Sequence, residues 1–331
     1  MSLAVRNATP SDIPRLIELL LLDAEERRDV DPILWKMAED APAEIAKALT
    51  FALTSEQQPF RQIWQVFEHL GTITGVIHSM LLPVPPIYAG KQGEPGLILP
   101  DSAVVPGAPD GTVNALTTAA ERALTNAGAK ILLSTHVTGK PWREVFRDRG
   151  YDPLTLYLSR TDLGGSRRPS TIRRADGADV PGIVTRAAEN KRILFKIDGF
   201  WERHPEADIR FAAWMNRSLT LKDRDMLVMG PSDDLTGYVI AQPASRLHFP
   251  PAHDITGTGV IDDYYHPDLA DSAVLAEDGE GATVLLRAAE AAFAGRGVDA
   301  AFVVCPAEWR SKREMLEAAG YKTAMVWSIR R

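Results

Sequence analysis

Five polar side chains follow one another at the end of an apolar run: Asp262, Asp263, Tyr264, Tyr265 and His266. Carboxylates, phenols and imidazoles are the groups that accept and donate protons in catalysis. If the run forms a strand, alternation places Asp262 and Tyr264 on one face and Asp263 and Tyr265 on the other. Only one of these faces can then meet a substrate. The alternative is structural, with the same groups capping loops or contacting a layer of helices.

A glycine turn, Gly279-Glu280-Gly281, follows this run and opens an alanine-rich stretch that predicts a helix. The first N–H groups of a helix lack partners within it, and the helix dipole adds positive potential, so such a turn can bind a phosphate. Glycines allow close approach because they carry no Cβ. The carboxylate of Glu280 opposes an anion unless it points to solvent. An ordinary tight loop is the alternative interpretation.

Composition excludes several classes of function. The chain has 331 residues, with 37 Lys and Arg against 44 Asp and Glu, a net charge of −7, so we expect no nucleic-acid partner. The single cysteine, Cys305, excludes a disulfide and a cysteine-based zinc cluster within one chain, and no histidine pair has metal-ligand spacing, so we expect no metal. No apolar run reaches the ~18 residues of a membrane span, and no signal sequence is recognised. We therefore expect a cytoplasmic protein that binds no membrane.

An internal repeat organises the elements that must position these residues. Residues 5–14 (VRNATPSDIP) match residues 172–181 (IRRADGADVP). Each segment predicts a short strand, a turn and the start of a helix. Asp12 and Asp179 suit the N-terminus of that helix, and the prolines two residues later suit its first turn.

The two halves also match at their ends and in the middle. Residues 131–160 align without a gap to residues 301–330, and each stretch predicts an apolar strand, a helix and a last strand. Gly150 and Gly320 occupy the same place in this match and predict the end of the helix. Helices are expected over 111–127 and 281–295 in the two middle segments. Asp101 occupies the place of Asp262, which makes Asp262 the leading candidate among these polar groups, although the repetition also argues for a structural role.

The predicted order in each half is strand, two helices, three strands, helix, strand, helix and strand. Together with the turn at Gly279 to Gly281, this order resembles the GCN5-related N-acetyltransferase (GNAT) family. The resemblance covers nearly the whole chain as two tandem copies. It implies an α/β fold in which each copy is a mixed sheet with helices on both faces.

A stretch rich in glycine, serine and proline, residues 164–170, predicts a linker between the copies. We place the first domain at residues 1–163 and the second at residues 168–331. The first-half counterpart of the glycine turn keeps one glycine, and there Val113 would crowd a phosphate while Asp110 would repel it. We therefore expect the first domain to be degenerate and the second to bind the cofactor.

The resemblance implies acetyl-CoA, or another acyl-CoA, as that cofactor. Its pyrophosphate would lie at the glycine turn and its pantetheine arm beside the preceding strand. The residues that the resemblance places at the cofactor are Tyr264, Tyr265, His266, Gly279, Glu280, Gly281, Ala282, Thr283 and Val284.

The reaction implied by the resemblance is direct transfer of an acyl group to an amine in a ternary complex. The amine is protonated at pH 7, so a base must remove a proton, and the candidates are Asp262, Asp263 and Tyr265. Members of the family often use a tyrosine as general acid, but the two matching positions hold Leu316 and Phe146. A non-catalytic acyl-CoA-binding or regulatory protein is therefore the alternative function.

Aromatic residues gather where the family binds its acceptor, on the first helices of the second half. They are Phe195, Phe200, Trp201, His204, Phe211 and Trp214. Such rings can bind an apolar or cationic molecule, but they can equally pack in the core. We expect a small-molecule amine as the acceptor, with a protein as the alternative. The sequence leaves monomer and homodimer open.

Overall fold

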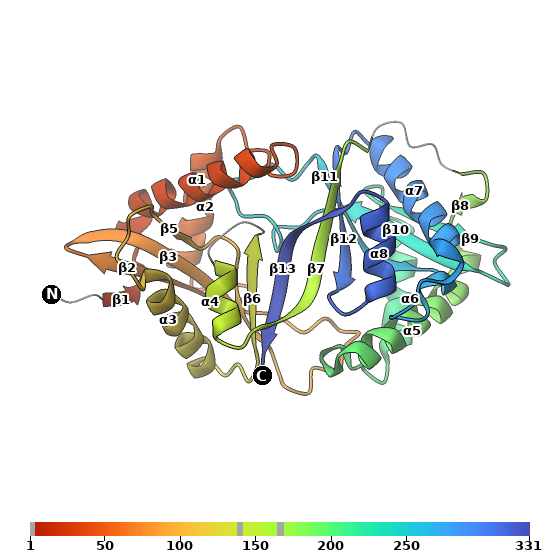
Figure 1. Ribbon diagram of the computed structural model, residues 1–331, viewed down its shortest axis with the longest axis horizontal. Coiled ribbons are helices and arrows are strands. Elements are labelled where there is room, and N and C mark those ends of the chain that lie inside the picture. Colours follow the sequence, from red (N-terminus) through yellow and green to blue (C-terminus); the bar gives the residue numbers. More distant parts are fainter. Residues whose placement is uncertain (1–3, 138–141, 164–168) are drawn as a thin grey trace.

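The computed structural model describes residues 4–137, 142–163 and 169–331, and its strands form one large sheet (Figure 1). In the first half the strands are β1 (Ala4–Asn7), β2 (Gln62–His69), β3 (Thr72–Leu81), β4 (Gly96–Ile98), β5 (Ala103–Val104), β6 (Leu132–Val137) and β7 (Asp152–Thr161). The helices of this half are α1 (Ile13–Val30), α2 (Ala41–Thr54), α3 (Thr112–Asn126) and α4 (Trp142–Asp148).

The second half repeats this order without the short strand β5. Its strands are β8 (Ile172–Arg174), β9 (Asp225–Met229), β10 (Gly237–Pro243), β11 (Thr258–Tyr265), β12 (Ala300–Pro306) and β13 (Lys322–Arg330). Its helices are α5 (Val180–Ile197), α6 (Ala207–Ser218), α7 (Glu280–Ala294) and α8 (Arg310–Ala318). None of the described helices has both the length and the apolar character needed to cross a membrane.

The local signals of the repeat are confirmed. Asp12 and Asp179 stand at the N-caps of α1 and α5, and each carboxylate forms a two-pronged ion pair with an arginine six residues earlier, Arg6 or Arg173. The helices expected over 111–127 and 281–295 are α3 and α7. The glycines after α4 and α8 both adopt left-handed backbone angles, with φ of 77° and 91°, as helix-ending glycines do.

The two halves exchange their last strands. The strand order is β1-β2-β3-β4-β6-β13-β7-β12-β11-β10-β9-β8, and β5 pairs with β3 off this path. Strand β13 of the second half therefore pairs with β6 of the first, and β7 of the first half pairs with β12 of the second. Figure 1 shows this central pair crossing the middle of the molecule. The domain extents 1–163 and 168–331 stay a prediction, and most of the linker that we expect between them lies outside the described residues.

Helices cover both faces of the sheet. In the first half, Trp64 and Val66 of β2 pack with α1 and α2, whereas Phe67 packs with α3 and α4. In the second half, a Cβ on Gly237 would meet Leu285 of α7, whereas the next side chain, Tyr238, pairs with α5. Successive residues on a strand point to opposite faces, so each half is a three-layer sandwich. A further apolar cluster joins the halves at the exchanged strands and includes Tyr157, Phe302 and Trp327.

Each half also sends a proline-rich loop onto the other half. The loop after β3 docks beside α6, where Ala89 N–H donates to the Glu202 carbonyl at 2.7 Å and His204 N–H donates to the Ile87 carbonyl at 3.0 Å. The matching loop after β10 docks beside α1, where Ala38 N–H donates to the Ala252 carbonyl at 2.9 Å. Because the contacts are reciprocal, the halves are related by an approximate two-fold arrangement, and each completes the other.

Candidate functional site

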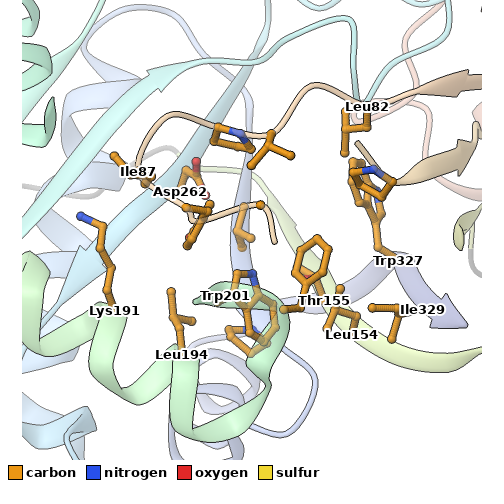
Figure 2. A pocket seen from close by; sticks show the side chains of 18 of the residues that line it. Leu82, Ile87, Leu154, Thr155, Lys191, Leu194, Trp201, Asp262, Trp327 and Ile329 are labelled. Atoms are coloured by element: carbon orange, nitrogen blue, oxygen red, sulfur yellow. The ribbon is translucent and has the colours of Figure 1, made fainter. Parts of the chain in front are cut away.

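One large cavity lies where the first half's loop covers the second half. Its volume is about 690 Å³, which is in the range of small-molecule sites. Strands β11, β12, β7 and β13, helix α5 and the loop after β3 all contribute to its wall. Figure 2 shows Asp262 and Lys191 toward one end, and Trp327 and Ile329 toward the other. Of the side chains labelled there, the two charged ones lie toward one end and the apolar Trp327 and Ile329 toward the other, although the wall also includes Lys91, Glu202 and Arg331. Both halves build the cavity.

A bulge in β11 aims two carboxylates into this cavity. Val239 of β10 pairs with Tyr264 and Ala241 pairs with Ile261, so β11 has one extra residue between these pairs. Asp262 and Asp263 lie in that interval, and both line the cavity. Our prediction that alternation separates these two aspartates was therefore wrong. Bulges of this kind redirect side chains beside many active sites.

The strands β11 and β12 separate at the same place. Their parallel ladder runs from Thr258 opposite Ala300 to Ile261 opposite Val303 and ends there, although both strands continue. The cavity extends along this opening past Val304 to Pro306. The two aspartates follow directly after the last paired residue of β11, so the opening and the carboxylates are parts of one site.

The pKa of the Asp262 carboxyl group lies near neutral pH. Although Asp262 is exposed to the cavity, the protein atoms that surround it and the neighbouring charge of Asp263 raise its pKa to about 6, and the two nearby lysines partly oppose this shift. The side chain remains open to the cavity. Asp263 accepts a hydrogen bond from the hydroxyl of Tyr238 at 3.2 Å. Asp262 can therefore exchange a proton at neutral pH, whereas Asp263 is held by a core tyrosine.

Two tyrosines of the first half face these carboxylates, and sequence reasoning missed both. Tyr88 lies in the docked loop and Tyr157 on β7, and both line the cavity. Burial raises the pKa of each hydroxyl, and the charge of Asp262 raises it further. Both hydroxyls therefore stay protonated at neutral pH and can donate. No signal in the second half points to them, because they are about 100 residues or more away in sequence.

Two lysines are buried at the same site. Lys191 on α5 is 2% exposed, and its Nζ lies 3.5 Å from the centroid of the Phe211 ring. Within the described part of the chain this Nζ makes no hydrogen bond. Lys312 on α8 is equally buried, and its Nζ donates to the Tyr264 carbonyl at 3.4 Å. Burial lowers the pKa of both ammonium groups.

The predicted acceptor aromatics divide into four groups. Phe200 and Trp201 line the cavity, as the acceptor hypothesis requires. Phe211 is buried beneath Lys191 and belongs to the core. Phe195 and Trp214 are 47% and 44% exposed and take no part in the cavity wall. The remaining candidate, His204, binds the docked loop through its backbone.

The matching space in the first half is filled. Counting from the N-caps of α1 and α5, Arg27 occupies the position of Leu194. Its guanidinium is buried, binds Asp23 and the Pro100 carbonyl, and lies 5.7 Å from the ring of Trp35. Two voids found in this region are each about 10 Å³. The longer side chain thus explains why the large cavity lies at the second half.

Asp101, the first-half counterpart of Asp262, has a structural role. Its two carboxylate oxygens lie 2.8 and 2.9 Å from Nδ1 of His78, which stacks on Trp64 at 3.8 Å. Asp101 is 6% exposed, and the void beside it is too small for a ligand. Asp101 therefore holds His78 in the packed first half, whereas its counterpart Asp262 faces the cavity in the second half.

The glycine turn before α7 is filled by the chain's own side chains. Asp268 accepts the Ala282 N–H at 3.0 Å, which is one of the donors expected to bind a phosphate. His266, whose Nδ1 lies 3.0 Å from Asp268, covers Gly281 so closely that a Cβ there would lie 2.2 Å from its ring. Gly281 thus makes room for a histidine of the same chain. The turn already holds an anion, the carboxylate of Asp268.

The remaining predicted cofactor residues also face inward or carry the wrong charge. Tyr264 is fully buried and its hydroxyl donates to the Ala282 carbonyl. Tyr265 lies outside the cavity wall, and its hydroxyl pairs with Glu189. Glu280 is exposed beside two further acids, while Thr283 and Val284 are half-buried in the first turns of α7. The residues present therefore do not fit the pyrophosphate of a coenzyme A at this turn.

Hydrogen bonds also tie α8 to the segment that follows β11. The indole N–H of Trp309 donates to the Leu269 carbonyl at 3.1 Å, and the hydroxyl of Ser311 donates to the Asp271 carbonyl at 2.6 Å. These bonds fix the start of α8 against the segment that follows β11. Lys312 adds its bond to Tyr264 across the opening between β11 and β12. The pantetheine arm that the resemblance implies would have to displace these contacts.

Comparisons with known proteins agree with the architecture. No protein-family model matches the chain, and no curated protein matches it. A GCN5-related N-acetyltransferase from Sphaerobacter thermophilus is 16% identical, and the match covers 99% of this chain and 95% of that chain with a TM-score of 0.56. A tandem GNAT protein from the clavulanic acid biosynthesis pathway is 14% identical, with 99% and 97% coverage and a TM-score of 0.51. The chain therefore has the GCN5-related N-acetyltransferase fold in two tandem copies.

Proposed function

We propose that this tandem acetyltransferase fold serves an N-acyltransferase whose acceptor, a small-molecule amine, binds in the cavity between the halves. The observation that carries this proposal is Asp262, a carboxylate with a pKa of about 6 that opens into a cavity of about 690 Å³. A base with a pKa near the working pH is suited to remove a proton from an ammonium group. The fold supports acyl transfer in general.

Different residues of the cavity bind the charged and the apolar parts of the amine. The ammonium group pairs with Asp262, and the apolar part of the molecule extends past Trp201 toward Trp327. Asp262 then takes one proton, which leaves the nitrogen with a free electron pair. The hydroxyls of Tyr88 and Tyr157 stay protonated and orient the carboxylate or the amine by donating to them.

The acyl donor implied by the fold is acetyl-CoA or another acyl-CoA, which would supply a thioester. Asp268 occupies the turn and Lys312 binds the Tyr264 carbonyl beside the strand opening, so the residues present do not fit this group in their present positions. These two contacts favour a second candidate function, a binding protein that keeps the amine pocket and has lost acyl transfer.

Two titrations separate the candidates. We would titrate phenethylamine, as a small primary amine, into the wild type, Asp262→Asn and the control Asp233→Asn, an exposed carboxylate outside the cavity wall. Both candidates predict binding that is lost only in Asp262→Asn. We would then titrate acetyl-CoA and follow release of the free thiol in the presence of the amine.

The outcomes are distinct. Binding of both molecules with thiol release supports the acyltransferase. Binding of the amine without binding of acetyl-CoA supports the binding protein. Equal amine binding by wild type and Asp262→Asn contradicts both, because neither can then place the amine at this carboxylate.

A further inference from the structure

The buried ammonium group of Lys191 is not used by the proposed amine site. It is 2% exposed, lines the cavity and makes no hydrogen bond within the described residues. The ring of Phe211 stabilises its charge from one side but accepts none of its N–H groups in a conventional hydrogen bond. A buried charged donor without an acceptor is costly, so this arrangement calls for a partner from outside the chain.

The other charges of the site do not supply that partner. No ion pair joins Lys191 to a carboxylate within the described residues, although Asp262 and Asp263 lie near enough to act on it through space. Asp263 is engaged by Tyr238, and Lys312 is engaged by the Tyr264 carbonyl. The Nζ atom is itself almost completely covered, so bulk water does not satisfy it. An amine whose other groups are all apolar would bring no acceptor for this ammonium group.

We propose that the cavity binds a zwitterion, whose ammonium group pairs with Asp262 and whose carboxylate accepts hydrogen bonds from Lys191. Figure 2 places these two residues toward the same end of the cavity, so the two charged groups of the ligand lie close together, as in an amino acid. The inference rests on the proposed function, because it names the class of amine that this function acts on.

The remaining residues of the cavity wall indicate which group the ligand carries besides its two charges. Trp201, Trp327 and Ile329 present apolar surface farther from Asp262 and Lys191. A volume of about 690 Å³ exceeds what a small amino acid fills. The ligand class is therefore an amino acid, or a close relative of one, with a bulky aromatic or branched apolar group.

Three matched probes test this inference: L-phenylalanine, phenethylamine, which lacks the carboxylate, and 3-phenylpropionate, which lacks the amine. We expect calorimetry on the full chain to give the tightest binding for phenylalanine, about tenfold or more tighter than phenethylamine, which is the effect of one charge-assisted hydrogen bond. We expect 3-phenylpropionate to bind most weakly, because its carboxylate then faces the two aspartates without an ammonium group between them.

Two variants test whether Lys191 causes the binding advantage of phenylalanine over phenethylamine. In Lys191→Met, which keeps the length of the side chain, the advantage of phenylalanine over phenethylamine should disappear, while phenethylamine binds as before or better. Lys196→Met, an exposed lysine of the same helix outside the cavity wall, should keep the advantage. Thermal unfolding establishes that each variant is folded before it is titrated.

The inference is overturned if the wild type binds phenethylamine as tightly as phenylalanine, a result that needs no variant and leaves the amine site itself standing. It is also overturned if Lys191→Met keeps the advantage. If none of the probes binds to the wild type, the proposed amine site fails together with the inference.

Discussion

Binding of an amine should depend on pH through Asp262. The folded protein raises the pKa of this carboxyl from 3.8 to about 6, so acidification below pH 6 converts the ionised form to the neutral acid within the folded state. An ammonium ligand pairs with the ionised form. Binding should therefore be strong above pH 6 and weaken as the pH falls through this value.

The size of the effect follows from the fraction of ionised Asp262. With a pKa of about 6, roughly ten molecules in eleven carry the charge at pH 7 and roughly one in eleven at pH 5. The apparent dissociation constant varies inversely with the competent fraction, so binding should weaken about tenfold between pH 7 and pH 5. His248, which also lines the cavity, does not distort this window, because burial lowers its pKa to about 4.

The assay is calorimetric titration of phenethylamine at pH 5, 6, 7 and 8, because its amine stays protonated throughout this range. The same series on Asp262→Asn should show weak binding that changes little with pH. A wild-type dissociation constant that is constant over the range would refute the reasoning, and so would an unchanged tenfold dependence in Asp262→Asn.

Four further predictions test the fold and the site. Replacing Arg27 by leucine removes a buried ion pair, so the free energy of unfolding in urea should fall by about 3–5 kcal/mol, and an unchanged value would show that the pair is dispensable. Gly281→Ala drives a Cβ into the ring of His266 and should cost about 1–3 kcal/mol of stability in the same assay, and an unchanged stability would show that the ring is not fixed there. Asp262→Asn should raise the melting temperature at pH 8 and not at pH 4, because the raised pKa penalises only the charged carboxylate, and equal shifts at both pH values would contradict this. Residues 168–331 produced alone lack β7 and leave β13 without either of its neighbours, so circular dichroism should show no cooperative thermal transition.

The fold was largely predictable because its signals are local and occur twice. The Arg–Asp pairs at the starts of α1 and α5 and the glycines that end α4 and α8 depend on residues a few positions apart. Repetition of such signals in one order is what made the duplication visible. The exchange of β7 and β13 was not predictable, because an apolar strand has no local feature that tells it which half to join.

The site was predictable only in part. Asp262 and Asp263 were found as candidates, but the bulge that turns both into one cavity depends on pairing with β10 rather than on their own sequence. Tyr88 and Lys191 were missed, because only the folded chain brings the first half's loop and α5 to the carboxylates.

At the glycine turn, the sequence motif predicted the backbone correctly but not the side chains that occupy it. Gly279 and Gly281 match the pattern of a phosphate site, and the backbone takes the expected shape, with Gly279 at the N-cap of α7. The pattern describes the turn and not what fills it. Here Asp268 and His266 fill it, and neither lies within the motif.

A crystal structure of the protein with phenethylamine bound would test the central claim most directly. The account predicts the ammonium nitrogen within hydrogen-bonding distance, about 2.7–3.0 Å, of the Asp262 carboxylate, with the phenyl ring toward Trp327 and Ile329. An amine bound outside this cavity, or one whose nitrogen points to the apolar end, would contradict it.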